Sequence, residues 1–175
     1  METVYLVGQI SSKAPESYLW RQRVTDELEG IVNINDPCMT EFNESIKETG
    51  IDPKKYIALT DGIDIIVPKD RLAVAQSTIG LANMVQYDKT KPLIGSCFEL
   101  AWYYDSPEKT VIGIYDGDRD NLLHKHPFIK AAVTTWVEDE YEACELIKGY
   151  FCYKELHIGK LCVDKVVCSN YLVAA

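Results

Sequence analysis

Residues 3–9 read "TVYLVGQ", a short run in which apolar β-branched and aromatic side chains predominate. A continuous apolar run of this length is typical of a strand that is buried on both faces, as the strands of a parallel sheet are. The Ile-Ser-Ser that follows is typical of a loop. We therefore expect a buried parallel strand that is followed directly by a loop.

The rest of the chain alternates between runs of this kind and segments with helical spacing. We expect further strands at residues 31–36, 78–84, 110–117 and 132–137. We expect helices at residues 14–30, 40–50, 69–77, 96–105 and 138–153. This alternation predicts an α/β fold, a flavodoxin-like three-layer sandwich with a five-stranded parallel sheet. Ligands bind such sheets at the carboxyl ends of the strands, so the loops 8–13, 85–95 and 116–121 should form the site.

The composition indicates an ordinary soluble domain. The 175 residues are 47% apolar and 26% charged, and the net charge is -9. We expect one domain over residues 1–155 and a β-rich tail over 156–175, which adds a further strand or crosses to a neighbour. An acidic chain does not suit a phosphate backbone, so we expect no nucleic-acid polymer as partner. The first residues are typical of neither a signal peptide nor a membrane span, so we expect no membrane partner and a cytoplasmic location.

Several familiar motifs are missing from the sequence. No GxGxxG follows the first strand and no GxxxxGK[ST] occurs, which disfavours dinucleotide and P-loop sites. The six cysteines form no CxxC pair, and we interpret them as small apolar residues in a reducing compartment. His124 and His126 are too few to hold zinc, so we expect surface histidines and no metal.

Two further groups of polar residues have no signature of a site. The sequence identifies no base that would activate Ser11, Ser12 or Ser96 as a nucleophile. The arginines are interpreted as solvated charges on helices, and they are Arg21, Arg23 and Arg71.

The carboxylates are more informative. Glu99 is the one carboxylate within the apolar stretch "PLIGSCFELAWY", residues 92–103, and either points to solvent or serves as a catalytic group. It follows the Gly95 loop by one turn or so, where the helix dipole should favour its ionised form. An ionised, partly desolvated glutamate there suits nucleophilic attack on a sugar carbon. Asp70 precedes the third strand and either caps a helix or acts on a substrate. An inward-facing Tyr5 is usually a core residue.

Taken in order along the chain, these segments resemble the nucleoside 2-deoxyribosyltransferase family. "TVYLVGQI" is similar to the first strand of the family, with Tyr5 at its active-site tyrosine. "GSCFELAWYY" resembles the family's G-x-x-x-E-L-G-x-A segment, with Glu99 as the nucleophile and Ala101 in place of the second glycine. "DRLAVAQSTIGLANM" is similar to the approach to the third strand, and Asp70 is its nearest candidate for the catalytic aspartate.

The resemblance also implies substrate-binding residues. These are Gly8, Gln9, Ile10, Asp88, Gly95, Ser96 and Asn121. Asp88 would replace an aspartate that many members carry six residues before the nucleophile, where this chain has Leu93. Asn121 lies in "DRDNLL", which resembles the loop that gives an asparagine to a neighbouring subunit. The resemblance therefore implies a homo-oligomer with shared active sites, with residues 156–175 at the subunit interface.

The resemblance implies a retaining double displacement without any cofactor. Glu99 would attack C1' of a 2'-deoxynucleoside while Asp70 protonates the leaving base, and a free nucleobase would then take the sugar. Two alternatives stay open. A sister group hydrolyses nucleoside 5'-monophosphates, and Ser11, Ser12 and Lys13 would then hold the phosphate. The chain could also be a non-catalytic nucleotide-binding module on the same scaffold, since fold does not fix function.

Overall fold

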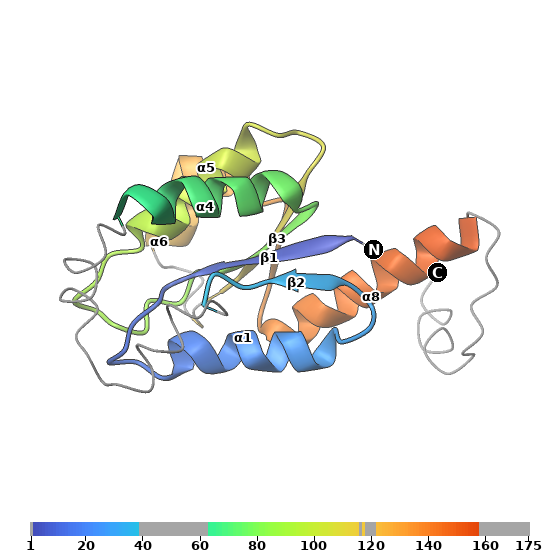
Figure 1. Ribbon diagram of the computed structural model, residues 1–175, viewed down its shortest axis with the longest axis horizontal. Helices are drawn as coiled ribbons and strands as arrows, with labels where there is room; N and C mark the ends of the chain where they lie inside the picture. Colours follow the sequence, from blue (N-terminus) through green and yellow to red (C-terminus); the bar gives the residue numbers. More distant parts are fainter. Residues whose placement is uncertain (1, 39–62, 116, 118–121, 158–175) are drawn as a thin grey trace.

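The computed structural model describes residues 2–38, 63–115, 117 and 122–157. The strands are β1 (Thr3–Gly8), β2 (Asn33–Asn35), β3 (Ile79–Asn83), β4 (Thr110–Ile114) and β5 (Thr135–Val137). The helices are α1 (Glu16–Glu27), α4 (Ile63–Gln76), α5 (Ile94–Tyr104), α6 (Leu122–Lys125), α7 (Pro127–Ala132) and α8 (Glu140–His157). The strand order is β2-β1-β3-β4-β5 and every pair is parallel. This is the flavodoxin-like order, so the predicted fold class is confirmed (Figure 1).

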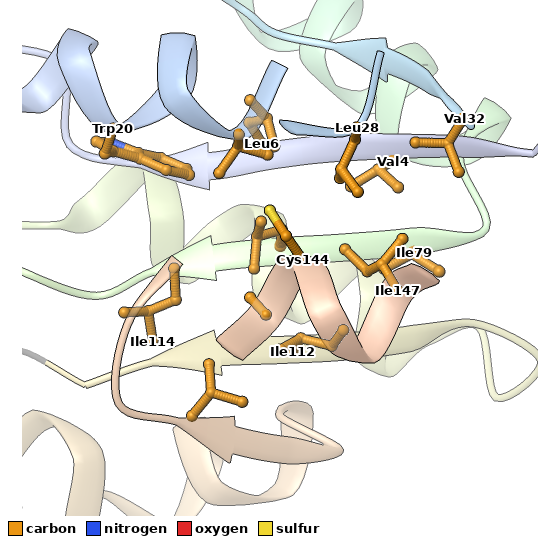
Figure 2. Packing of buried hydrophobic residues seen from close by; sticks show 14 residues of the cluster. Val4, Leu6, Trp20, Leu28, Val32, Ile79, Ile112, Ile114, Cys144 and Ile147 are labelled. Atoms are coloured by element: carbon orange, nitrogen blue, oxygen red, sulfur yellow. The ribbon is translucent and has the colours of Figure 1, made fainter. Parts of the chain in front are cut away.

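The sheet lies between two layers of helices. Figure 1 shows α1 and α8 on one face and α4 and α5 on the other. Successive side chains of a strand point to opposite faces, and β1 follows this rule. Val4 and Leu6 belong to the core cluster of α1 and α8 (Figure 2), whereas Tyr5 and Val7 belong to the cluster beneath α4 and α5. All four side chains are fully buried, as the apolar run predicts.

Aromatic side chains lie directly on the sheet on the α5 side. A Cβ atom on Gly80 would come within 2.8 Å of the Tyr103 ring, and one on Gly113 would come within 2.8 Å of the Trp136 ring. The Tyr103 hydroxyl also donates to the carbonyl of Ile79 at 3.2 Å. The Tyr103 contacts hold α5, the helix that carries Glu99, close against the sheet.

Two helices differ from the sequence prediction. We expected a helix over 69–77, but α4 begins at Ile63 and continues through Pro68, although proline lacks the N–H of the helical ladder. We expected a strand over 132–137, but α7 runs to Ala132 and β5 begins only at Thr135. Pro127 at the first position of α7 suits a helix start. The helix expected over 40–50 lies outside the described residues.

The prediction that His124 is a surface histidine is wrong. Its side chain is buried, and its ring centroid lies 5.2 Å from that of Tyr115 and 4.9 Å from that of Trp136. His124 thus belongs to an aromatic cluster beyond β4 and β5. His126 is exposed as expected and stacks on Phe128.

Within the described residues, no helix combines the length and the apolar character that crossing a membrane requires. The cysteines whose side chains the structure describes are Cys38, Cys97 and Cys144, and each is a free thiol. Cys38 and Cys144 are buried, as small apolar side chains would be.

Candidate functional site

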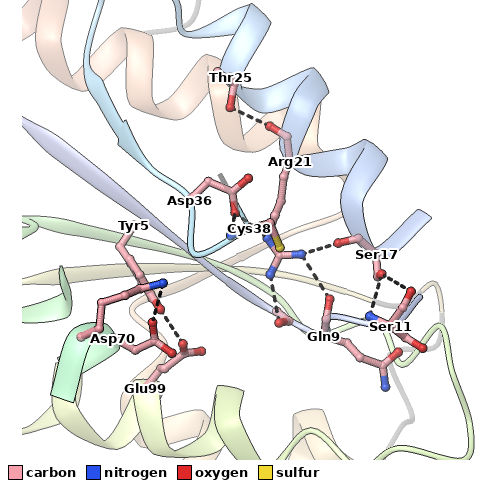
Figure 3. A network of polar contacts seen from close by, with 12 residues as sticks. Tyr5, Gln9, Ser11, Ser17, Arg21, Thr25, Asp36, Cys38, Asp70 and Glu99 are labelled. Atoms are coloured by element: carbon pink, nitrogen blue, oxygen red, sulfur yellow. Dashed lines mark hydrogen bonds and ion pairs between the residues drawn. The ribbon is translucent and has the colours of Figure 1, made fainter. Parts of the chain in front are cut away.

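The candidate site lies on the α4 and α5 side of β1. β1 is flanked by β2 and β3, so the strand order reverses there, and ligands of open α/β sheets bind at such a point. Tyr5 comes from β1, Asp70 from α4 and Glu99 from α5. Figure 3 shows these three side chains pointing toward one another. Residues that lie far apart in the sequence are therefore brought together, as the resemblance implies.

A short hydrogen bond joins two of these residues. The Tyr5 hydroxyl donates to Oε1 of Glu99 at 2.6 Å, and both side chains are buried. Glu99 is 8% exposed, so it does not point to solvent from α5. A hydrogen bond from a hydroxyl to a carboxylate fixes the carboxylate and favours its ionised form. Tyr5 is therefore a buried core residue whose hydroxyl also orients Glu99.

The charge state of Glu99 is set mainly by burial. Desolvation raises the pKa of Glu99 to about 7. The Tyr5 hydrogen bond lowers the pKa, the nearby Asp70 raises it, and the more distant positive charge of Arg21 lowers it. We expected the helix dipole to keep this carboxylate ionised, but burial outweighs the favourable effects. Glu99 is consequently poised to titrate near neutral pH.

Asp70 is not a helix cap. It lies in the middle of α4, and its side chain is 17% exposed. Its Oδ1 atom is buried and accepts no hydrogen bond from the described residues, although the Lys69 ammonium lies 3.8 Å away. Desolvation raises the pKa of Asp70, and the Lys69 charge lowers it by less. A raised pKa favours the protonated form, which is the form that a general acid needs.

The loops after β1 and β3 are joined through Gln9. The Gln9 amide nitrogen donates to the carbonyls of Asp88 and Lys91, at 3.0 and 2.8 Å. The Gln9 amide oxygen accepts from the Asp88 backbone N–H at 2.6 Å. Gln9 is 5% exposed, so its side chain links the two loops and does not face solvent.

Asp88 is also held by its side chain. Oδ1 accepts from the backbone N–H and the hydroxyl of Thr90, at 2.9 and 2.6 Å, and Oδ2 accepts from the Ser11 hydroxyl at 2.8 Å. The Thr90 and Ser11 hydrogen bonds lower the pKa of Asp88 to about 2. Asp88 is therefore an ionised carboxylate that closes the loop, and base recognition by Asp88 stays a prediction.

The prediction that Arg21 is a solvated charge is wrong. Arg21 is 1% exposed, and its Nε lies 3.2 Å from Oδ1 of Asp36, the residue after β2. Arg23 matches the prediction, because its half-exposed side chain pairs with Glu16 and Glu140 on the surface. Arg71 is exposed as well.

The other predicted binding residues lie around this network. Gly8 ends β1, and Ile10 follows Gln9 in the half-buried loop. Ser96 is buried in the first turn of α5, whereas Gly95 is exposed, and no atom lies within 4 Å of where its Cβ would be. Asn121 and most of the tail 156–175 lie outside the described residues, so the shared site and the extra strand stay predictions.

An apolar pocket of about 580 Å³ lies on the outer side of α5. Its lining residues are Gln86, Pro92, Leu93, Ile94, Cys97, Phe98, Ala101, Leu123 and Phe128. Tyr5, Asp70 and Glu99 do not line it, so this pocket is separate from the candidate site. The described residues include no group of three or more His, Cys, Asp or Glu side chains that could hold a metal ion.

Comparisons with known proteins support the fold. Neither a family model nor a curated protein matches this chain. In structure, the chain is similar to a conserved protein from Enterococcus faecalis V583, whose crystal structure gives a TM-score of 0.50 at 17% identity. That match covers 86% of this chain and 99% of the other. At this level of identity the similarity shows that the two proteins share a fold.

Proposed function

We propose that this protein transfers 2-deoxyribose between nucleobases by a retaining double displacement. The observation that carries the proposal is the buried carboxylate of Glu99, oriented by the 2.6 Å hydrogen bond from Tyr5 beside a second carboxyl group, Asp70. Glycosyl transfer with retention requires two carboxyl groups, one as nucleophile and one as acid. Glu99 is ionised, as a nucleophile must be, above its pKa of about 7.

In the first half of the proposed reaction, a carboxylate oxygen of Glu99 forms a bond to C1' of a 2'-deoxynucleoside. The bond from C1' to the base nitrogen breaks, and its electron pair leaves with the base. Asp70 supplies the proton that neutralises the departing base, directly or through water. The product is a covalent deoxyribosyl ester of Glu99 and a free nucleobase.

In the second half, the nitrogen of another nucleobase attacks C1' and displaces the Glu99 carboxylate. Asp70, now ionised, accepts the proton that this nitrogen loses. Attack by water instead would release free deoxyribose. The two inversions at C1' restore the original configuration, which is the stereochemical outcome of a double displacement.

The hydrogen bonds of the first loop favour a nucleoside over a 5'-monophosphate. Ser11 is buried and donates its hydroxyl to the ionised Asp88, so this hydroxyl is engaged and a phosphate beside it would meet a like charge. The Arg21 guanidinium is turned to backbone carbonyls and Asp36. Ser12 and Lys13 are exposed and remain as groups that could contact a phosphate.

One assay separates the proposal from its alternatives. The protein is incubated with a deoxynucleoside, or with its 5'-monophosphate, and a different free base. A new deoxynucleoside supports the proposed transfer, whereas free deoxyribose or its phosphate indicates a hydrolase and absence of turnover indicates a binding module. Glu99→Gln should lose the exchange. Glu108→Gln, which changes an exposed glutamate just after α5, should retain it.

A further inference from the structure

Arg21 is among the largest fully buried side chains of the described protein. A guanidinium group always carries its charge, and burying it is costly unless its N–H groups are paired. An apolar side chain at this place on α1 would avoid that cost. Arg21 is 1% exposed, so it cannot be a surface contact for a ligand. The role of Arg21 must therefore come from the groups that its guanidinium binds.

Those groups belong to three parts of the chain: the end of β1, α1 itself and the residue after β2. Nη2 donates to the carbonyl of Gly8 at 2.9 Å, and Nη1 donates to the carbonyl of Gln9 at 3.1 Å and to that of Ser17. Asp36 completes the set as the ion-pair partner. Figure 3 shows Arg21 reaching from α1 to the backbone that leaves β1, with Asp36 alongside. The planar fork of the guanidinium thus holds two successive carbonyls at the end of β1.

The backbone at Gly8 is shaped for this contact. A Cβ atom there would lie 3.3 Å from Nη2 of Arg21, 3.1 Å from the Trp20 ring and 3.0 Å from the carbonyl oxygen of Asn83. Three neighbours would therefore have to move if a side chain were present. Glycine lets α1, β1 and the end of β3 meet around the guanidinium.

We propose that Arg21 is a positioning residue for the candidate site: by holding the carbonyls of Gly8 and Gln9, it orients the Gln9 side chain that fixes the segment leading into α5. This inference rests on the proposed function in so far as it concerns catalysis. The Gln9 amide binds both backbone groups of Asp88 and the carbonyl of Lys91, and α5 begins at Ile94. A shift of Gln9 would therefore reach the helix that carries Glu99.

Electrostatics act in the same direction as this geometry. The positive charge of Arg21 lowers the pKa of Glu99, whereas Asp70 raises it. Asp36 faces Arg21 and offsets part of its charge, and Tyr5 is the hydrogen-bond donor to Glu99. The charge of Arg21 therefore favours ionised Glu99, in addition to the hydrogen bonds by which Arg21 holds the loop.

The test compares Arg21→Lys with Arg23→Lys. Lysine keeps the charge but lacks the planar fork that binds two carbonyls at once. Arg23 lies on the same helix with a half-exposed side chain and serves as the matched control. The direct measurement is amide hydrogen exchange at Asp88, whose N–H donates to Gln9. We expect exchange about tenfold faster in Arg21→Lys, with Ile112 in β4 unchanged, and no change at Asp88 in Arg23→Lys.

The second measurement is turnover well below the melting temperature of each variant. A displacement of α5 should lower kcat for base exchange by about tenfold to a hundredfold in Arg21→Lys, and leave kcat unaltered in Arg23→Lys. A merely structural role would lower the melting temperature and leave kcat unchanged. If Arg21→Lys does not fold, the double variant Arg21→Met with Asp36→Asn replaces it, since no buried charge is then left unpaired.

The outcomes keep the two proposals apart. Faster amide hydrogen exchange at Asp88 together with a lower kcat for base exchange supports the role of Arg21. Unchanged exchange at Asp88 in the folded variants, or unchanged kcat, overturns it. If the wild-type protein itself transfers no deoxyribose between bases, the proposed function fails. The amide hydrogen exchange at Asp88 then still decides whether Arg21 holds the loop.

Discussion

The Tyr5 hydroxyl donates a 2.6 Å hydrogen bond to Oε1 of Glu99, which lies 94 residues further along the chain. The bond spans from the middle of β1 to the second turn of α5, and both side chains are buried. It ties the candidate nucleophile to an interior strand of the sheet. Among the described residues, Tyr5 is the hydrogen-bond donor to this carboxylate. Loss of the bond should therefore alter both the position and the pKa of Glu99.

Tyr5→Phe should weaken the proposed activity and shift its pH dependence. The Tyr5 hydrogen bond lowers the pKa of Glu99, so the acid limb of the pH profile should move to higher pH. An unsatisfied buried carboxylate should also cost about 1–3 kcal/mol of unfolding free energy. Profiles of kcat/KM and denaturant unfolding check both effects. Tyr104→Phe is the control, because Tyr104 lies on α5 with Glu99 but is 65% exposed. An equal shift of the pH profile in Tyr104→Phe would contradict the role of Tyr5.

Glu99 should make the protein less stable as the pH rises toward neutrality. Its folded-state pKa is raised from 4.5 to about 7, so between these values the folded protein keeps a proton that the unfolded chain releases. Stability from this group is present below about pH 4.5 and is lost up to about pH 7. Relative to Glu99→Gln, the wild type should lose about 3 kcal/mol between pH 4 and pH 8. Parallel pH dependences of the two proteins in urea unfolding would contradict the prediction.

Asp70→Asn should lower base exchange without unfolding the protein. General acids typically contribute a factor of about 10² to 10⁴, so kcat should fall by that order, most for bases that leave poorly. Removing an ionisable group that burial disfavours should leave stability unchanged or slightly higher at neutral pH. Lys69→Met, which removes the positive charge beside Asp70, is the control. Turnover of Asp70→Asn close to the wild-type value would show that Asp70 is not the acid.

Gly80→Ala should destabilise the fold through Tyr103. The added methyl would meet the Tyr103 ring at 2.8 Å on the face that carries α5, and overpacking of this kind costs about 1–3 kcal/mol. Gly149→Ala in α8 is the matched control, because no atom lies within 4 Å of its Cβ position. That change should stabilise the protein by about 0.5–1 kcal/mol through helix propensity. Thermal unfolding of both variants checks the opposite signs.

The sheet could be predicted because its strands are continuous apolar runs. Residues 3–9, 78–84 and 110–117 each contain an observed strand, and alternation with helices sets the parallel arrangement. The extent of α4 could not be predicted, because Pro68 is a local breaker that the packed helix tolerates. Likewise, the strand predicted over 132–137 includes Ala132, an apolar residue that ends α7 instead.

The candidate site could be predicted only in part. Glu99, Asp70 and Tyr5 were identified by resemblance and lie together, but the pKa of Glu99 depends on burial that no local pattern shows. The prediction of a solvated Arg21 is wrong, although the spacing of Arg21 along α1 indicates burial. It follows the buried Ser17 by four residues and precedes Val24 by three, so it lies on the buried face of α1.

The most direct test of the account is mass spectrometry of the protein quenched with acid during turnover of a deoxynucleoside. The account predicts that the peptide containing Glu99 gains the mass of one deoxyribosyl group. It also predicts that fragmentation places this group on Glu99 and that a second free base, added before the quench, removes it. Turnover by the wild type with no adduct, or with an adduct on another residue, would contradict the proposed nucleophile.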